Sequence, residues 1–105
     1  NPTGVLVDNA EGLVARVIPP PSRAQVKEMI TDAIAEMHRW GLTGVHDAGA
    51  SGQTLELYEE LGREGKLNIR LYAMISDHAP TIEAWFRRGP LVGGYDGTLW
   101  VRSIK

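Results

Sequence analysis

From residue 22 onward the sequence alternates between stretches with helical periodicity and short stretches that are almost continuously apolar. The expected helices cover residues 22–40, 54–63 and 81–88, and the expected strands end near residue 47 and cover residues 68–76 and 99–105. Consecutive parallel strands need crossover connections, so this alternation favours an α/β fold with a parallel sheet. The apolar content of residues 68–76 also predicts that this strand is buried on both faces.

The best-defined element is the helix that follows the triple proline, Pro19–Pro21. Ser22 and Gln25 have the spacing of a capping box, in which two side chains satisfy backbone N–H groups of the first turn. Apolar residues then recur at helical spacing as far as Trp40, and Gly41 is a typical terminator. The same spacing predicts that the large apolar side chains of these elements pack in the core: Met29, Met37, Trp40, Trp85 and Trp100.

The first 21 residues follow neither the helical nor the strand period. Val5 and Val7 are compatible with a short strand, and the polar pairs that follow them are typical of turns. The triple proline cannot continue a helix or a strand ladder. We therefore expect an extended connection over residues 1–21 and alternating helix and strand units over residues 22–105. Residues 89–97 are expected to form a glycine-rich loop.

The composition limits the classes of partner. The net charge is −2 and no basic patch is evident, so we expect neither nucleic acid nor an anionic membrane as a partner. The chain has no cysteine, which excludes disulfides and thiolate metal ligands. No apolar run approaches the length of a membrane span. The 105 residues suffice for one domain, and the sequence assigns no compartment.

Five segments occur in an order that resembles the YtcJ-like amidohydrolases, which are metal-dependent hydrolases of the amidohydrolase superfamily. They are N-P-T-G-V-L-V-D-N-A, I-P-P-P-S, G-L-T-G-V-H-D-A-G, L-E-L-Y-E-E-L-G-R-E-G-K-L-N-I-R-L-Y-A-M-I and R-S-I-K. The resemblance covers nearly the whole chain and implies a (β/α)₈ barrel. A whole barrel needs about 250 residues, so these residues are expected to form only an arc of one. The start at Asn1 rather than Met agrees with an internal fragment.

The resemblance further implies hydrolysis of an amide-type C–N bond in a small-molecule substrate by metal-activated water, with one or two divalent ions, zinc being expected. The His-x-His pair of the family would lie before Asn1, and its later histidines and aspartate would lie after Lys105. The 105 residues are therefore expected to bind no metal and to be inactive alone, without a catalytic residue of their own.

Lys105 is the candidate metal ligand. It ends the last expected strand, and active sites of barrels lie at the carboxyl ends of the strands. In many relatives a lysine at such a position is carboxylated and bridges two metal ions. The alternative is that Lys105 is simply an unmodified, exposed lysine at the end of the chain.

His46 and Asp47 end the first expected strand and are candidates for contact with substrate or for supporting groups that contact it. Neighbours in a strand point to opposite faces, so the two side chains cannot easily face one metal ion. Asp47 is also expected to accept N–H groups of the residues that follow it. The run Ser76-Asp77-His78 is expected to be a turn rather than a catalytic triad. His38 is expected on the solvated side of its helix.

Two alternatives stay open at this point. The chain can be a stand-alone α/β module for binding or assembly, because an arc of barrel exposes strand edges and an apolar face that favour a homo-oligomer. It can also belong to another hydrolase of the same superfamily, such as a deaminase or a D-aminoacylase. Nothing in the sequence identifies the substrate.

Overall fold

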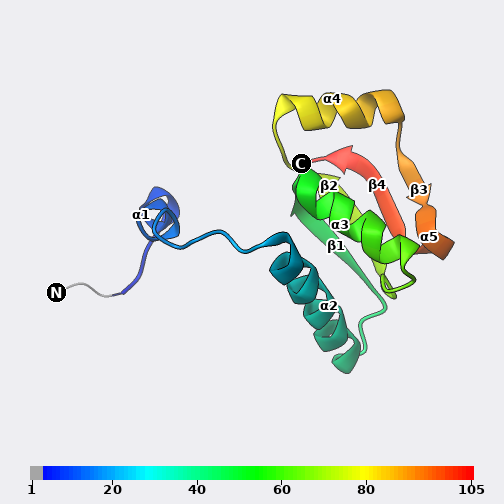
Figure 1. Cartoon of the computed structure of the whole chain (residues 1–105), viewed down its shortest axis with the longest axis horizontal. Helices are drawn as coiled ribbons and strands as arrows, with labels where there is room; N and C mark the ends of the chain where they lie inside the picture. The colour runs from blue at the N-terminus through cyan, green and yellow to red at the C-terminus, as the bar shows by residue number, and fades with distance from the viewer. Residues whose placement is uncertain (1–3) are drawn as a thin grey trace.

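The structure, a computed structural model, describes residues 4–105 and has the α/β architecture expected from the sequence (Figure 1). Its elements, in chain order, are η1 (Asp8–Ala10), α1 (Glu11–Ala15), α2 (Arg23–Arg39), β1 (Gly44–Ala50), α3 (Gly52–Arg63), β2 (Arg70–Ile75), α4 (Ala79–Arg88), β3 (Leu91–Gly93), α5 (Gly94–Gly97) and β4 (Leu99–Ile104). The four strands form one sheet in the order β1-β2-β4-β3.

The sheet is mostly parallel. Strand β2 pairs in parallel with β1 on one side and with β4 on the other, whereas β3 pairs antiparallel with β4 through Leu91 and Val101. Helix α3 connects β1 to β2, and α4 lies in the connection from β2 to β4. The register places Ala50 beside Ile75 and Ile75 beside Ile104, so the three parallel strands end together at one edge.

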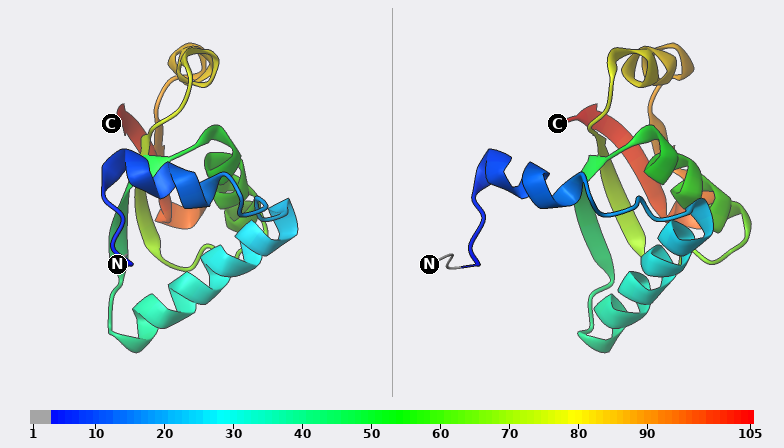
Figure 2. Two further views of the ribbon diagram at one scale, coloured as in Figure 1. Left: turned by 90° about the vertical axis from the view of Figure 1, so that its left-hand side faces the viewer. Right: turned by 60° about the vertical axis from the view of Figure 1, so that its left-hand side comes forward.

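One face of the sheet is covered and the other is open. Figure 2 shows α2 and α3 on the same side of the sheet, while α4 lies beyond the edge where the parallel strands end. The core lies on the covered side and consists of buried apolar residues: Ile34, Ala50, Leu55, Leu57, Tyr58, Leu61, Leu67, Ile69, Leu71, Ala73, Ile75, Leu99 and Val101. The prediction that residues 68–76 are buried on both faces is wrong, because Tyr72 and Met74 on the open face are only half-buried.

Helix α2 confirms the capping prediction and corrects the core prediction. Ser22 Oγ accepts from Gln25 N at 3.3 Å, and Gln25 Oε1 accepts from Ser22 N at 2.8 Å. The predicted packing of Met29 and Trp40 in the core is wrong: they are 61% and 76% exposed. Within residues 4–105 this side of the helix is open to solvent, and Trp40 Nε1 donates to Glu36 Oε1 at 2.8 Å.

The remaining large apolar side chains have mixed outcomes. Met37 and Trp85 are partly buried and pack against the core, as predicted. Trp100 is half-buried on the open face rather than packed in the core.

Three local expectations are also corrected. Residues 8–15 are helical where turns were expected, and Val5 and Val7 are not in a strand. Strand β1 continues to Ala50 instead of ending near Asp47. The glycine-rich loop contains β3, whose formation depends on pairing with the distant strand β4. None of the helices in residues 4–105 has the length and apolar character that a membrane crossing requires.

Candidate functional site

The carboxyl ends of β1, β2 and β4 form the edge at which Lys105 lies. Ser76 N donates to Ala50 O at 2.9 Å, and Lys105 N donates to Ile75 O at the same distance. The backbone of Lys105 therefore continues the ladder, and its side chain is exposed at this edge. Within residues 4–105 no group of three or more His, Cys, Asp or Glu side chains is placed to hold a metal ion.

His46 and Asp47 lie on opposite faces of β1, as the strand period predicts. The exposed His46 ring lies on the open face, with its centroid 5.1 Å from that of Tyr72 and the two planes tilted by 47°. Asp47 lies on the covered face, where Oδ2 accepts from the hydroxyl of Tyr58 at 2.8 Å and Oδ1 accepts from Gly49 N at 3.0 Å. The two side chains therefore cannot act together on one ligand.

The contact of Asp47 with Tyr58 connects β1 to α3. Burial raises the pKa of the Tyr58 hydroxyl above its ordinary value, and the hydrogen bond to Asp47 raises it further. Tyr58 therefore stays protonated and acts as a permanent donor to Asp47. This arrangement gives Asp47 a structural role, in agreement with the expected hydrogen bonding to the residues that follow it.

Asp77 connects the end of β2 to the start of α3. Its Oδ2 accepts from Gly52 N at 2.6 Å, and its Oδ1 accepts from His78 N at 2.7 Å. The hydrogen bonds from these two N–H groups lower the pKa of Asp77, and the one from Gly52 has the largest effect. His78 is the N-cap residue of α4. Because both oxygens of Asp77 accept backbone N–H groups, this run is a structural turn, as expected.

His38 departs in part from its expected environment. The residue is exposed, as predicted, but its Nε2 lies 3.1 Å from the carbonyl oxygen of Asn68. This contact joins the end of α2 to the segment before β2.

The open face brings together a group of residues whose proximity the sequence did not indicate. His46, Tyr72 and Trp100 lie in one row across β1, β2 and β4. Together with Arg70 and Arg102 they line a hollow of about 350 Å³. The usable signal in the sequence was the two-residue alternation of β2 and β4, which places Arg70 with Tyr72 and Trp100 with Arg102.

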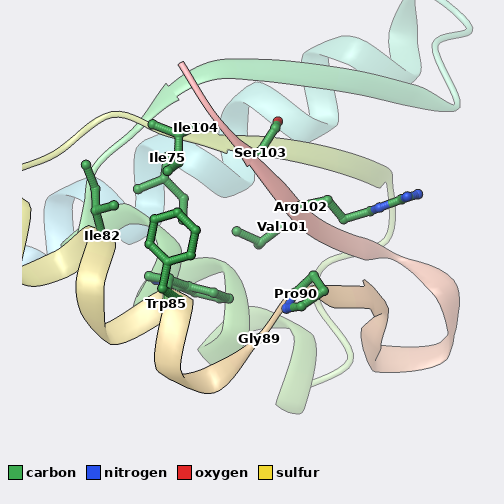
Figure 3. A pocket seen from close by; sticks show the side chains of 10 residues that line it. Ile75, Ile82, Trp85, Gly89, Pro90, Val101, Arg102, Ser103 and Ile104 are labelled. Carbon is green, nitrogen blue, oxygen red and sulfur yellow. The ribbon is translucent and has the colours of Figure 1, made fainter.

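A second hollow of about 310 Å³ separates α4 from the end of β4 (Figure 3). Ile82 and Trp85 of α4 line one side, and Val101 and Ile104 of β4 line the other. Within the described residues the buried Ser103 Oγ has no hydrogen-bond partner. In Figure 3 this oxygen points away from Trp85, so the hollow offers mainly apolar surface.

The comparisons with known proteins give one informative similarity. The chain is 31% identical over 99 residues to the protein of Bacillus subtilis (strain 168) named "Putative amidohydrolase YtcJ". This alignment covers 90% of the chain but 18% of that protein, so the chain spans less than a fifth of the length of this curated relative. No protein-family model matches the chain. No solved structure matches it.

This similarity supports an amidohydrolase-like relationship for residues that fold as an α/β unit with a mostly parallel sheet.

Proposed function

We propose that these residues form an arc of the (β/α)₈ barrel of a metal-dependent amidohydrolase. The observation that carries the proposal is the arrangement of β1, β2 and β4, which are parallel, joined by helical connections and level at their carboxyl ends. This arrangement occurs in a stretch that is similar over 99 residues to a protein named as an amidohydrolase. In a barrel, the carboxyl edge is where active sites are built.

The described residues do not make a complete metal site. His46 and Asp47 face opposite sides, and Lys105 is the only candidate ligand at the carboxyl edge that the sequence singled out. A divalent metal, with zinc expected, would therefore need ligands from further residues of a longer protein. The corresponding reaction is hydrolysis of an amide-type C–N bond in a small molecule, with the 105 residues inactive alone.

The test compares the 105-residue chain with a longer gene product that contains it. Metal content measured by mass spectrometry and turnover of simple amides and formamides are expected in the longer protein only. Lys105→Ala is expected to remove bound metal and turnover, while Lys66→Ala is the matched control because Lys66 is an exposed lysine paired with Glu64 at 3.0 Å. Stoichiometric metal in the 105-residue chain would overturn the proposal.

A second candidate function is a stand-alone module for assembly. The observation that favours it is the open face of the sheet, where aromatic and cationic side chains line a hollow that no helix of residues 4–105 covers. A metal-free longer protein without amidase activity, together with a stable oligomer of the 105-residue chain, would favour this candidate.

A further inference from the structure

The N-terminal arm, defined as residues 8–18, presents an apolar surface to solvent. Leu13, Val14, Val17 and Ile18 are between 44% and 73% exposed. Hydrogen bonds from Val17 N to Val14 O and from Ile18 N to Ala15 O continue the helical path of α1. The pairs Leu13–Val17 and Val14–Ile18 are therefore spaced to share one side of the arm. Figure 1 shows α1 standing away from the sheet.

The open face of the sheet is a surface of matching character. His46, Tyr72 and Trp100 lie side by side on three strands and line the hollow of about 350 Å³. For the part of the chain that the structure describes, Figure 2 shows no helix over this side of the sheet. An exposed apolar surface of this kind, rimmed by charged residues, is typical of an interaction site.

The charges of the two surfaces are complementary. The arm exposes two carboxylates, Asp8 and Glu11, and one guanidinium, Arg16, which leaves a net charge of −1, whereas Arg70 and Arg102 line the hollow. Arg70 donates to Thr43 Oγ1 at 2.8 Å, but within residues 4–105 neither arginine forms an ion pair. On the covered side, by contrast, Arg23 and Lys27 are each paired with glutamates. The open face thus has cations available for a partner with carboxylates.

We propose that the arm of one copy of this chain docks on the open face of a second copy, and that the exchange is reciprocal in a two-fold dimer. A second copy is favoured over the arm's own sheet because the stiff Pro19–Pro21 spacer directs the arm away from it. In a two-fold dimer each contact between an arm and an open face therefore occurs twice. The inference concerns the 105-residue chain by itself and rests on the assembly candidate, because in a closed barrel the open face would be the inner wall of the barrel.

The first experiment measures the oligomeric state by sedimentation velocity over a range of concentrations. The wild-type chain is expected to form a dimer, and Val14→Asp with Val17→Asp is expected to weaken dimerisation at least tenfold, because two charges replace the apolar side of the arm. The matched control is Met29→Asp on α2, a helix that lies on the covered side of the sheet, where Met29 is 61% exposed. The control is expected to dimerise as the wild type does, with circular dichroism checking that each variant is folded.

The second experiment exchanges the charges. An arm variant carries Asp8→Arg and Glu11→Arg, and a face variant carries Arg70→Glu and Arg102→Glu. Each variant alone is expected to be monomeric, because its arm and face then have the same sign. An equimolar mixture is expected to form a heterodimer, since the reversed arm meets the reversed face and the two unchanged surfaces also match.

Three outcomes would overturn the proposal. They are a wild-type chain that stays monomeric at all concentrations, a dimer that Met29→Asp disrupts as strongly as the arm substitutions, and a mixture of charge variants that does not associate. A monomeric wild type whose arm amides are protected from hydrogen exchange would show instead that the arm folds onto its own sheet. Amidase activity of a longer protein is measured separately, so failure of this inference leaves that proposal unaffected.

Discussion

The two faces of the sheet differ in burial, although neighbouring residues of the same strands form them. On β4, Leu99 and Val101 are fully buried under the helices, whereas Trp100 is half-buried and Arg102 is exposed on the open face. The same alternation runs along β2, where Leu71 is buried. Because successive strand residues point to opposite sides, a single short segment supplies both the core and the open surface.

This difference shows where the stability of the chain resides. The helices α2 and α3 bury leucines on one face, while the other face keeps aromatic and cationic side chains accessible. Substitutions of adjacent residues should therefore have very different effects, and matched pairs across the sheet test the comparison directly.

The largest effect is expected from Leu99→Ala compared with Trp100→Ala. Leu99 is 0% exposed, so its truncation leaves a cavity in the core and should lower the free energy of unfolding by about 2–5 kcal/mol. Trp100 is half-buried beside the open hollow, and its truncation should cost less than half as much. Urea unfolding followed by far-UV circular dichroism measures both. Both variants are measured at a protein concentration at which the chain is monomeric, so that no docked arm covers Trp100. Equal losses there would contradict the comparison.

A smaller effect is expected from Tyr58→Phe compared with Tyr72→Phe. The hydroxyl of the buried Tyr58 donates to Asp47 Oδ2 at 2.8 Å, and its removal leaves a partly buried carboxylate oxygen without that donor. The expected loss is about 1–3 kcal/mol of unfolding free energy. Tyr72 is half-buried on the open face, where its loss of a hydroxyl should change stability by less than about 0.5 kcal/mol. The same urea titration separates the two, and a larger loss at Tyr72 would contradict the comparison.

Local patterns explain why parts of the fold were predictable. The capping box of α2 involves residues three apart, so Ser22 and Gln25 identify the start of the helix without any tertiary information. Helical periodicity identified the correct face of α2 but not its coverage. It cannot tell that Met29 and Trp40, at the margin of this face, are exposed to solvent.

Features that depend on distant segments were not predictable. Strand β3 exists because Leu91 pairs with Val101, and no pattern in three residues reveals that partner. The turn that follows holds Tyr95 and Asp96 at φ values of 55° and 58°, which residues other than glycine rarely adopt. The Tyr95 ring packs directly against Gly62 of α3, and this contact helps to explain the unusual backbone conformation of the turn. A Cβ on Gly62 would lie 2.5 Å from the Tyr95 ring.

The candidate site divides in the same way. The strand period correctly separated His46 from Asp47, because that argument needs only the residues themselves. The donors that Asp47 and Asp77 receive from α3 lie 11 and 25 residues away, and nothing in the sequence indicates those pairings. The role of Lys105 as a metal ligand stays a prediction from the resemblance.

The smallest effect is expected from the ion pairs that, within residues 4–105, occur on the covered side and not on the open face. Glu60 accepts from Lys27 Nζ at 2.5 Å and from Arg23 Nη2 at 2.9 Å. These hydrogen bonds lower the pKa of Glu60 from 4.5 to about 2, and the one from Lys27 has the largest effect. A carboxylate whose pKa is lower in the folded state stabilises the protein above its ordinary pKa. That contribution is lost as the pH falls from about 4.5 toward about 2.

Glu60→Gln should therefore lower the urea midpoint at pH 7 and should have progressively less effect between pH 4.5 and pH 2.5. The matched control is Glu28→Gln on α2, since within residues 4–105 the carboxylate of Glu28 forms no ion pair. Its effect on the midpoint should be small at every pH. Added salt should also reduce the Glu60 effect, because these charges lie near the surface. A Glu60→Gln effect that is constant across this pH range would show that the pairing with Lys27 and Arg23 does not stabilise the covered side.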